Sequence, residues 1–138
     1  IALNREYKKL LIGIRNILNK AEYMRVADYI TQFIADLGVK DIFMLTGGGA
    51  MFLNDAAAQN KSIRGIFNHH EQAGAMGAFA YSKYTGNWGA CYVTTGCGTT
   101  NALTGLLDAW QDNVPVMFIS GQIKTADTVA RLGLPLKQ

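Results

Sequence analysis

The sequence TTGCGTTN at residues 94–101 is the clearest indication of the fold, because it joins an apolar stretch to a helical pattern. The apolar stretch, residues 88–94, predicts a buried strand. Gly96 and Gly98 permit a tight turn, and the pattern that follows predicts a helix to about Trp110. A strand that turns within a few residues into a helix is the basic unit of a parallel α/β sheet.

The same unit recurs on both sides of this stretch. Further strands are expected at residues 41–45, 63–67 and 116–120, and further helices at residues 26–37, after the turn 46–49 to about residue 59, and at residues 71–84. Alternating strands and helices with short loops imply parallel strands covered on both faces. We therefore predict an α/β fold, a doubly wound parallel sheet with helices on both faces.

The first twenty residues form a separate pattern. They place seven apolar side chains on one helical stripe, namely Leu3, Tyr7, Leu10, Leu11, Ile14, Ile17 and Leu18. We predict an amphipathic helical extension over residues 1–23, followed by one domain over residues 24–138. The net charge is +4 over residues 1–25 and −1 over the remainder, so the charge of the domain argues against nucleic-acid binding.

Composition limits the other classes of function. No apolar run reaches the roughly 18 residues of a membrane-spanning helix, and no signal peptide is visible, so we expect no membrane association and a cytoplasmic location. Two cysteines are too few for a disulfide framework, and none has zinc-site spacing. Cys91 alternates with apolar neighbours in an expected strand, and we expect it in the core.

Ligands gather at the carboxyl ends of strands in such sheets. Three loops lie at those ends, residues 46–49, 94–98 and 120–122, and the segment entering the helix at residue 71 follows a fourth strand end. We predict that these four segments converge on one site.

Glu71 is the most informative residue of that site. It is the only acid between Asp55 and Asp108, and it opens a helix of small and apolar residues. A carboxyl in such surroundings can serve as a proton donor or acceptor. The structural alternative is that Glu71 merely complements the helix dipole from an exposed first turn.

The glycine turns are compatible with two other functions. Helix N-termini after such turns can bind phosphate, which suggests a nucleotide-binding module, but neither turn contains a complete nucleotide motif. Cys97 could be a nucleophile at a helix start, with His70 as its base. A tight turn with close backbone approach explains the same glycines without either function.

Ordered motifs give the chain a resemblance to a known family. HEQ at residues 70–72 resembles the H-E-Q-x-A segment of thiamine-diphosphate enzymes, and TTGCGTTNALTGL at residues 94–106 resembles their T-S-G-P-G-A-T-N-x-x-T-G-[IL] run. DAWQDNVP at residues 108–115 resembles D-A-x-x-D-x-x-P, and SGQ at residues 120–122 resembles T-G-Q. The similarity covers about residues 24–130. This region is similar to the amino-terminal, pyrimidine-binding domain of the acetolactate synthase-like group.

The resemblance implies a cofactor and roles for particular residues. The cofactor is thiamine diphosphate, and the glutamate at the position of Glu71 bonds N1′ of its aminopyrimidine and activates it. Residues Thr46, Gly47 and Gly48 would lie along the pyrimidine, and Cys97 would contact it by van der Waals packing. Asn101, also expected at the cofactor site, would secure the turn and helix start. Gln122 would reach the 4′-amino group or the substrate, a 2-oxo acid.

The resemblance also implies partners. No G-D-G with a downstream Asn occurs in the chain, so Mg2+ and the diphosphate would be bound by a domain not in this chain. We expect a fragment or subunit of a carboligase or decarboxylase, inactive alone, that forms a homodimer or joins a complementary diphosphate-binding domain. The alternative within the same fold is a non-catalytic dimerisation or regulatory module. Thr46 and Cys97 stand where the family pattern has proline, which leaves the subfamily open.

Overall fold

The sheet has four parallel strands in the order β2-β1-β3-β4. A computed structural model describes residues 24–133, so the predicted extension over residues 1–23 lies outside the described residues. The strands are β1 (Asp41–Met44), β2 (Arg64–Phe67), β3 (Gly89–Val93) and β4 (Val116–Ser120). The chain adds β2 on one side of β1 and then β3 on the other side. The strand order therefore reverses between β1 and β3, and such a reversal is where α/β sheets bind ligands.

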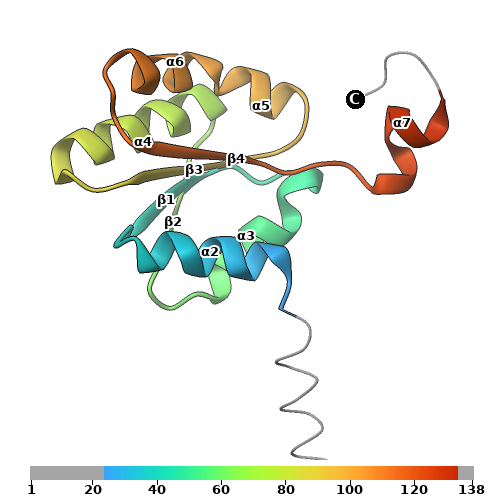
Figure 1. The fold of residues 1–138 in the computed structure, drawn as a ribbon, viewed down its shortest axis with the longest axis horizontal. Coiled ribbons are helices and arrows are strands. Elements are labelled where there is room, and N and C mark those ends of the chain that lie inside the picture. Colours follow the sequence, from blue (N-terminus) through green and yellow to red (C-terminus); the bar gives the residue numbers. More distant parts are fainter. Residues whose placement is uncertain (1–23, 134–138) are drawn as a thin grey trace, which may run out of the picture.

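Helices cover both faces of the sheet (Figure 1). The helices α2 (Val26–Asp36) and α3 (Met51–Gln59) form one layer, and α4 (Glu71–Thr85), α5 (Cys97–Asn101) and α6 (Leu103–Gln111) form the other. Two short 3-10 turns, η1 (Gly48–Ala50) and η2 (Thr125–Asp127), and the short helix α7 (Val129–Leu132) complete the described chain. The predicted doubly wound α/β fold is confirmed.

The central strand β3 shows why these residues form this sheet. All five of its residues are buried, as expected for a strand covered on both faces. Its side chains alternate, so Tyr92 packs in the core beneath α2 and α3, whereas Cys91 and Val93 pack in the core beneath α4. The buried Tyr92 hydroxyl is paired with Thr31 Oγ1 at 2.9 Å. The expectation that Cys91 lies in the core is confirmed.

The helix expected from the glycine turn to Trp110 is interrupted. It is divided into α5 and α6 at the buried Ala102, whose N–H donates to the carbonyl of Thr99, three residues earlier. Such a bond tightens the turn and redirects the chain. The turn before α5 requires a glycine, since Gly96 has a φ of +66°.

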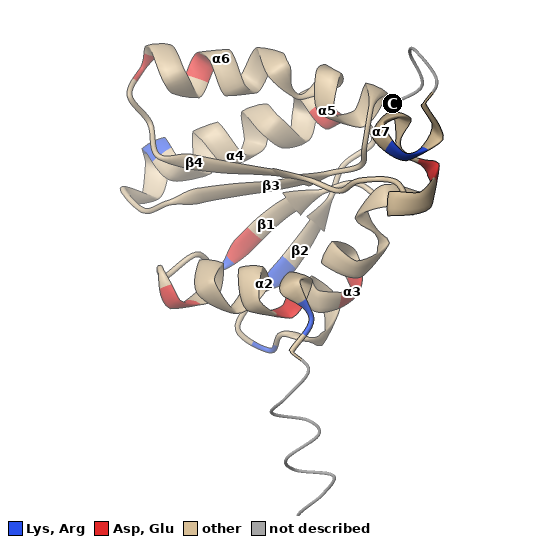
Figure 2. Cartoon of the chain, turned by 45° about the vertical axis from the view of Figure 1, so that its right-hand side comes forward, with Lys and Arg blue, Asp and Glu red and all other residues tan. Residues whose placement is uncertain are grey.

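Charged residues occur mainly in the layer formed by α2, α3 and the adjoining strands (Figure 2). Arg25 is paired with Asp28 and Asp55 at 2.6 Å, and Arg64 with Asp41 at 2.6 Å. The layer of α4 to α6 carries fewer charges, and Glu71 is the one acid of α4. Among residues 24–133, no helix has the length and hydrophobicity needed to cross a membrane.

Candidate functional site

Three loops meet at the carboxyl ends of the strands. The Gly49 N–H donates to Thr94 Oγ1 at 3.1 Å, which joins the loop after β1 to the loop after β3. The Thr95 hydroxyl donates to Gln122 Oε1 at 2.9 Å, which joins the loops after β3 and β4. The predicted convergence of the loops is therefore confirmed, and it falls at the reversal of strand order between β1 and β3.

Two glycines make this close approach possible. A Cβ on Gly47 would overlap the side chain of Thr94, and a Cβ on Gly121 would overlap the backbone of Gly49. By contrast, the space beside Gly48 is open, since nothing lies within 4 Å of a Cβ built there. Thr46, just before these glycines, is exposed. The loop after β1 thus has a crowded side toward β3 and an open side toward solvent.

The fourth predicted segment joins the same cluster through Glu71. Glu71 is the first residue of α4 and is partly buried. The amide nitrogen of Asn101 donates to Glu71 Oε2 at 3.0 Å. The other oxygen, Oε1, would lie 3.3 Å from a Cβ on Gly98. Glu71 is therefore more than an exposed residue at a helix end, because α5 packs directly against its carboxylate.

The two cysteines lie in contrasting environments. Burial, and to a smaller extent the charge of Glu71, raises the pKa of the Cys91 thiol to about 12. Cys97, the first residue of α5, is exposed. The side chain of His70 caps α4, since the Gln72 N–H donates to His70 Nδ1 at 3.1 Å. That ring nitrogen is consequently engaged with the backbone rather than with Cys97.

The orientation of the Gln122 amide follows from its partners. Its Oε1 accepts from the Thr95 hydroxyl and, at 2.8 Å, from the Ile123 N–H. A backbone N–H can only donate, so the oxygen must be the atom on that side. The exposed Gln122 side chain therefore has its NH2 group left to donate to an acceptor.

Sequence reasoning assigned no role to Thr94 and Thr95, although both lie within the motif that it singled out. Their hydroxyls hold the three loops together. Asn54 was also missed. Its Nδ2 donates to the Leu45 carbonyl at 3.1 Å and so anchors the loop after β1, while its buried Oδ1 has no partner among residues 24–133. No signal in the sequence distinguishes Asn54 from the other polar residues of α3, Asp55 and Gln59.

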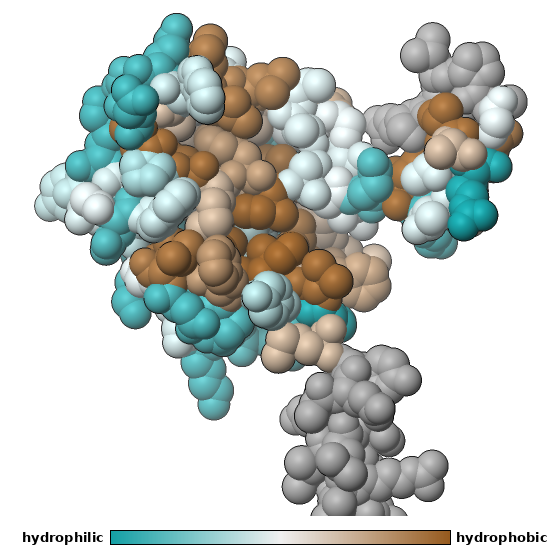
Figure 3. All heavy atoms as spheres, viewed as in Figure 1, coloured by the Kyte–Doolittle hydropathy of each residue, from teal (hydrophilic) through white to brown (hydrophobic). Residues whose placement is uncertain are grey.

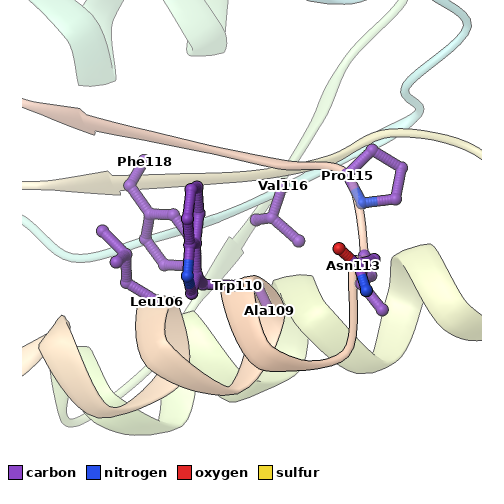
Figure 4. A pocket seen from close by; sticks show the side chains of 8 residues that line it. Leu106, Ala109, Trp110, Asn113, Pro115, Val116 and Phe118 are labelled. Atoms are coloured by element: carbon purple, nitrogen blue, oxygen red, sulfur yellow. The ribbon is translucent and has the colours of Figure 1, made fainter.

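A separate hollow of about 500 Å3 lies between α6 and β4 (Figure 4). Pro115 and Val116 line it at the beginning of β4, so it lies at the opposite end of that strand from the loop cluster. Trp110 and Phe118 make its walls largely apolar, and Asn113 is its one polar side chain. No titratable side chain lines this hollow. Within residues 24–133, no three His, Cys, Asp or Glu side chains gather as a metal site would require.

Comparison with known proteins identifies the family of the chain. Residues 24–135 match the family described as thiamine pyrophosphate enzyme, N-terminal TPP binding domain. The chain is 37% identical over 97 residues to the chloroplastic acetolactate synthase of Arabidopsis thaliana, and 40% identical over 97 residues to the acetolactate synthase large subunit of Haemophilus influenzae. Each match covers 70% of this chain but only 14% and 17% of those relatives. The chain therefore belongs to the thiamine pyrophosphate enzyme family and corresponds to its N-terminal cofactor-binding domain.

Proposed function

We propose that this domain supplies the pyrimidine side of the thiamine-diphosphate site in an acetolactate synthase-like enzyme that decarboxylates or ligates 2-oxo acids. The observation that carries the proposal is the position of Glu71. Its carboxylate lies where the loop after β3 meets the start of α4, at the reversal of strand order in the sheet. Thiamine diphosphate supplies a carbon nucleophile for the substrate carbonyl and stabilises the electron pair released with CO2.

The loop cluster at the carboxyl ends of the strands has the features needed to bind an aminopyrimidine ring. Activation of such a ring needs a carboxyl group that shares a proton with N1′, and binding needs a surface against which a flat group can lie. Among residues 24–133, no donor contacts Glu71 Oε1, so this oxygen is available to hydrogen-bond N1′ through that shared proton. The open space beside Gly48 is compatible with a ring lying along the loop. Thr46, Gly47, Cys97 and Asn101 are proposed to complete this side of the site.

Gln122 is proposed to face the substrate. The 4′-amino group and the substrate differ in what they require, since an amino group donates whereas the carboxylate and carbonyl oxygens of a 2-oxo acid accept. Because Gln122 Oε1 is already engaged by two donors, its NH2 group is better suited to a substrate oxygen. Glu71 would thus act on the cofactor, and Gln122 would orient the substrate.

The remaining parts of the site are proposed to come from outside this chain. The matched region is a small share of each relative, so Mg2+ and the diphosphate would be bound by another domain, in a homodimer or with a complementary subunit. The comparisons favour neither a non-catalytic module nor a nucleotide-binding one. A cytoplasmic location stays a prediction, since the relatives include chloroplastic plant enzymes.

The variant Glu71→Gln tests the proposal in the complete enzyme that carries this domain. Glutamine keeps the size of the side chain but cannot hold the proton. We expect hydrogen–deuterium exchange at C2 of bound thiamine diphosphate, followed by NMR after acid quench, to slow by about 100-fold or more. Binding of the cofactor, measured by calorimetry, should persist, which would separate activation from affinity.

Asp36→Asn is the matched control, because Asp36 is an exposed acid at the end of α2. It should exchange at the normal rate. Exchange at the normal rate in Glu71→Gln would overturn the assigned role of Glu71.

A further inference from the structure

Asn101 was expected to secure the turn and helix start, but its amide is directed at Glu71. Its Nδ2 lies 3.0 Å from Glu71 Oε2. A carboxylate has only acceptors, so the NH2 group of the amide must be the part that faces it. The contact joins residues thirty positions apart, and it is the one side-chain hydrogen bond that Glu71 makes within residues 24–133.

Close packing of the helix backbones next to this pair fixes the distance between the two side chains. One helical turn beyond Glu71 is Ala75, and the same number of residues beyond Asn101 is Gly105. A Cβ on Gly105 would lie 2.6 Å from the Ala75 Cβ, so α4 and α6 touch at their backbones one turn from the pair. Such close packing leaves little freedom in the spacing of the two helices.

The helix that carries Asn101 is itself anchored to the end of the sheet. The Thr99 hydroxyl donates to the Thr94 carbonyl, just after β3, at 3.0 Å and is paired with the hydroxyl of Ser120 in β4 at 2.5 Å. Gly98 is buried, and a Cβ there would lie 2.7 Å from Thr94 Cγ2. Asn101 is thus a donor on a fixed support, which is the arrangement needed to orient another side chain.

We propose that Asn101 is a positioning residue that acts through Glu71. By holding Oε2, it fixes the plane of the carboxylate and leaves Oε1 directed to the ligand. This inference rests on the proposed function, because a fixed carboxylate matters only if Glu71 activates the cofactor. Asn101 itself exchanges no proton with the cofactor or the substrate.

The variant Asn101→Asp separates this role from a structural one. Aspartate has nearly the same shape and serves equally well in turns and at helix ends, but it replaces the donor with a second carboxylate beside Glu71. In the complete enzyme with thiamine diphosphate and Mg2+, we expect C2 exchange and kcat to fall about 10- to 100-fold. The fall should diminish as the pH is lowered, since one proton shared by the two carboxylates restores a hydrogen bond.

Two comparisons make the result decisive. Asn87→Asp makes the same chemical change in an exposed loop and should leave exchange unaltered. In a Glu71→Gln background, Asn101→Asp should cause no further loss, because there is no carboxylate left to orient.

The outcomes are distinguishable. Normal exchange in Asn101→Asp beside impaired exchange in Glu71→Gln would overturn the inference and leave the proposed function intact. Normal exchange in Glu71→Gln would overturn the proposed function and the inference with it. An equal loss from Asn101→Asp in both backgrounds would show that Asn101 acts independently of Glu71, which also contradicts the inference.

Discussion

At the scale of single residues, the same side chain has opposite properties at positions 91 and 97. The thiol of Cys91 is buried in β3, and burial raises its pKa to about 12, so it stays protonated at neutral and mildly alkaline pH. Cys97 is exposed at the start of α5. The thiolate is the reactive form of cysteine, and these environments should therefore produce a large difference in alkylation.

Iodoacetamide at pH 8 measures this difference. We expect Cys97 to be carbamidomethylated in the native protein while Cys91 stays unmodified, with both modified after denaturation. Both cysteines lie on the one tryptic peptide that follows Lys83 and ends at Lys124. Fragment mass spectra of that peptide therefore locate the label. Comparable labelling of both residues in the native state would contradict the buried position of Cys91.

At the scale of elements, the contact between α4 and α6 depends on a glycine. The higher helix propensity of alanine should add about 0.5–1 kcal/mol to the free energy of unfolding of the variant Gly105→Ala. The added Cβ would lie 2.8 Å from the backbone carbon of Ala75 and 2.8 Å from the Met76 nitrogen, where no side chain can move aside. Overpacking costs about 1–3 kcal/mol, so we expect a net loss of about 1–2 kcal/mol in the free energy of unfolding.

Urea unfolding checks this expectation, with Gly48→Ala as the control because nothing lies within 4 Å of a Cβ there. The control should unfold close to the original midpoint. A Gly105→Ala variant as stable as the control would show that α4 and α6 separate easily. That result would also weaken the argument that they hold Glu71 and Asn101 in register.

The elements also show which parts of the structure can be predicted from the sequence. Residues 88–94 and 116–120 predicted strands to within a residue or so of β3 and β4, because apolar runs between turns depend on local sequence. The convergence of the loops followed from parallel strands, whose carboxyl ends share one edge. The break at Ala102 was missed, since the helical pattern continues through it. The bond from Asn101 to Glu71 was missed because it depends on how tightly α4 packs against α5 and α6.

At the scale of the whole molecule, exposed hydrophobic surface occurs on both helical layers. Val26 and Phe33 are exposed on α2, whose layer shows hydrophobic residues in Figure 3. On α6, Trp110 is 79% exposed and Leu107 is 51% exposed. Large exposed apolar side chains on two layers are typical of a domain that packs against neighbours. This agrees with a cofactor site completed by other parts of a larger enzyme.

Without such neighbours, the chain should be inactive. In its proposed role, Glu71 can share a proton with the pyrimidine only if the cofactor is held, and the diphosphate provides most of the charge by which it can be held. With thiamine diphosphate, Mg2+ and pyruvate, we expect no CO2 release above background from residues 1–138 alone, and turnover from the complete enzyme in the same assay. Adding the complementary domain to the isolated chain should restore part of that turnover. Robust turnover by the chain alone would mean that it binds the diphosphate itself, and the division of the site between domains would then be wrong.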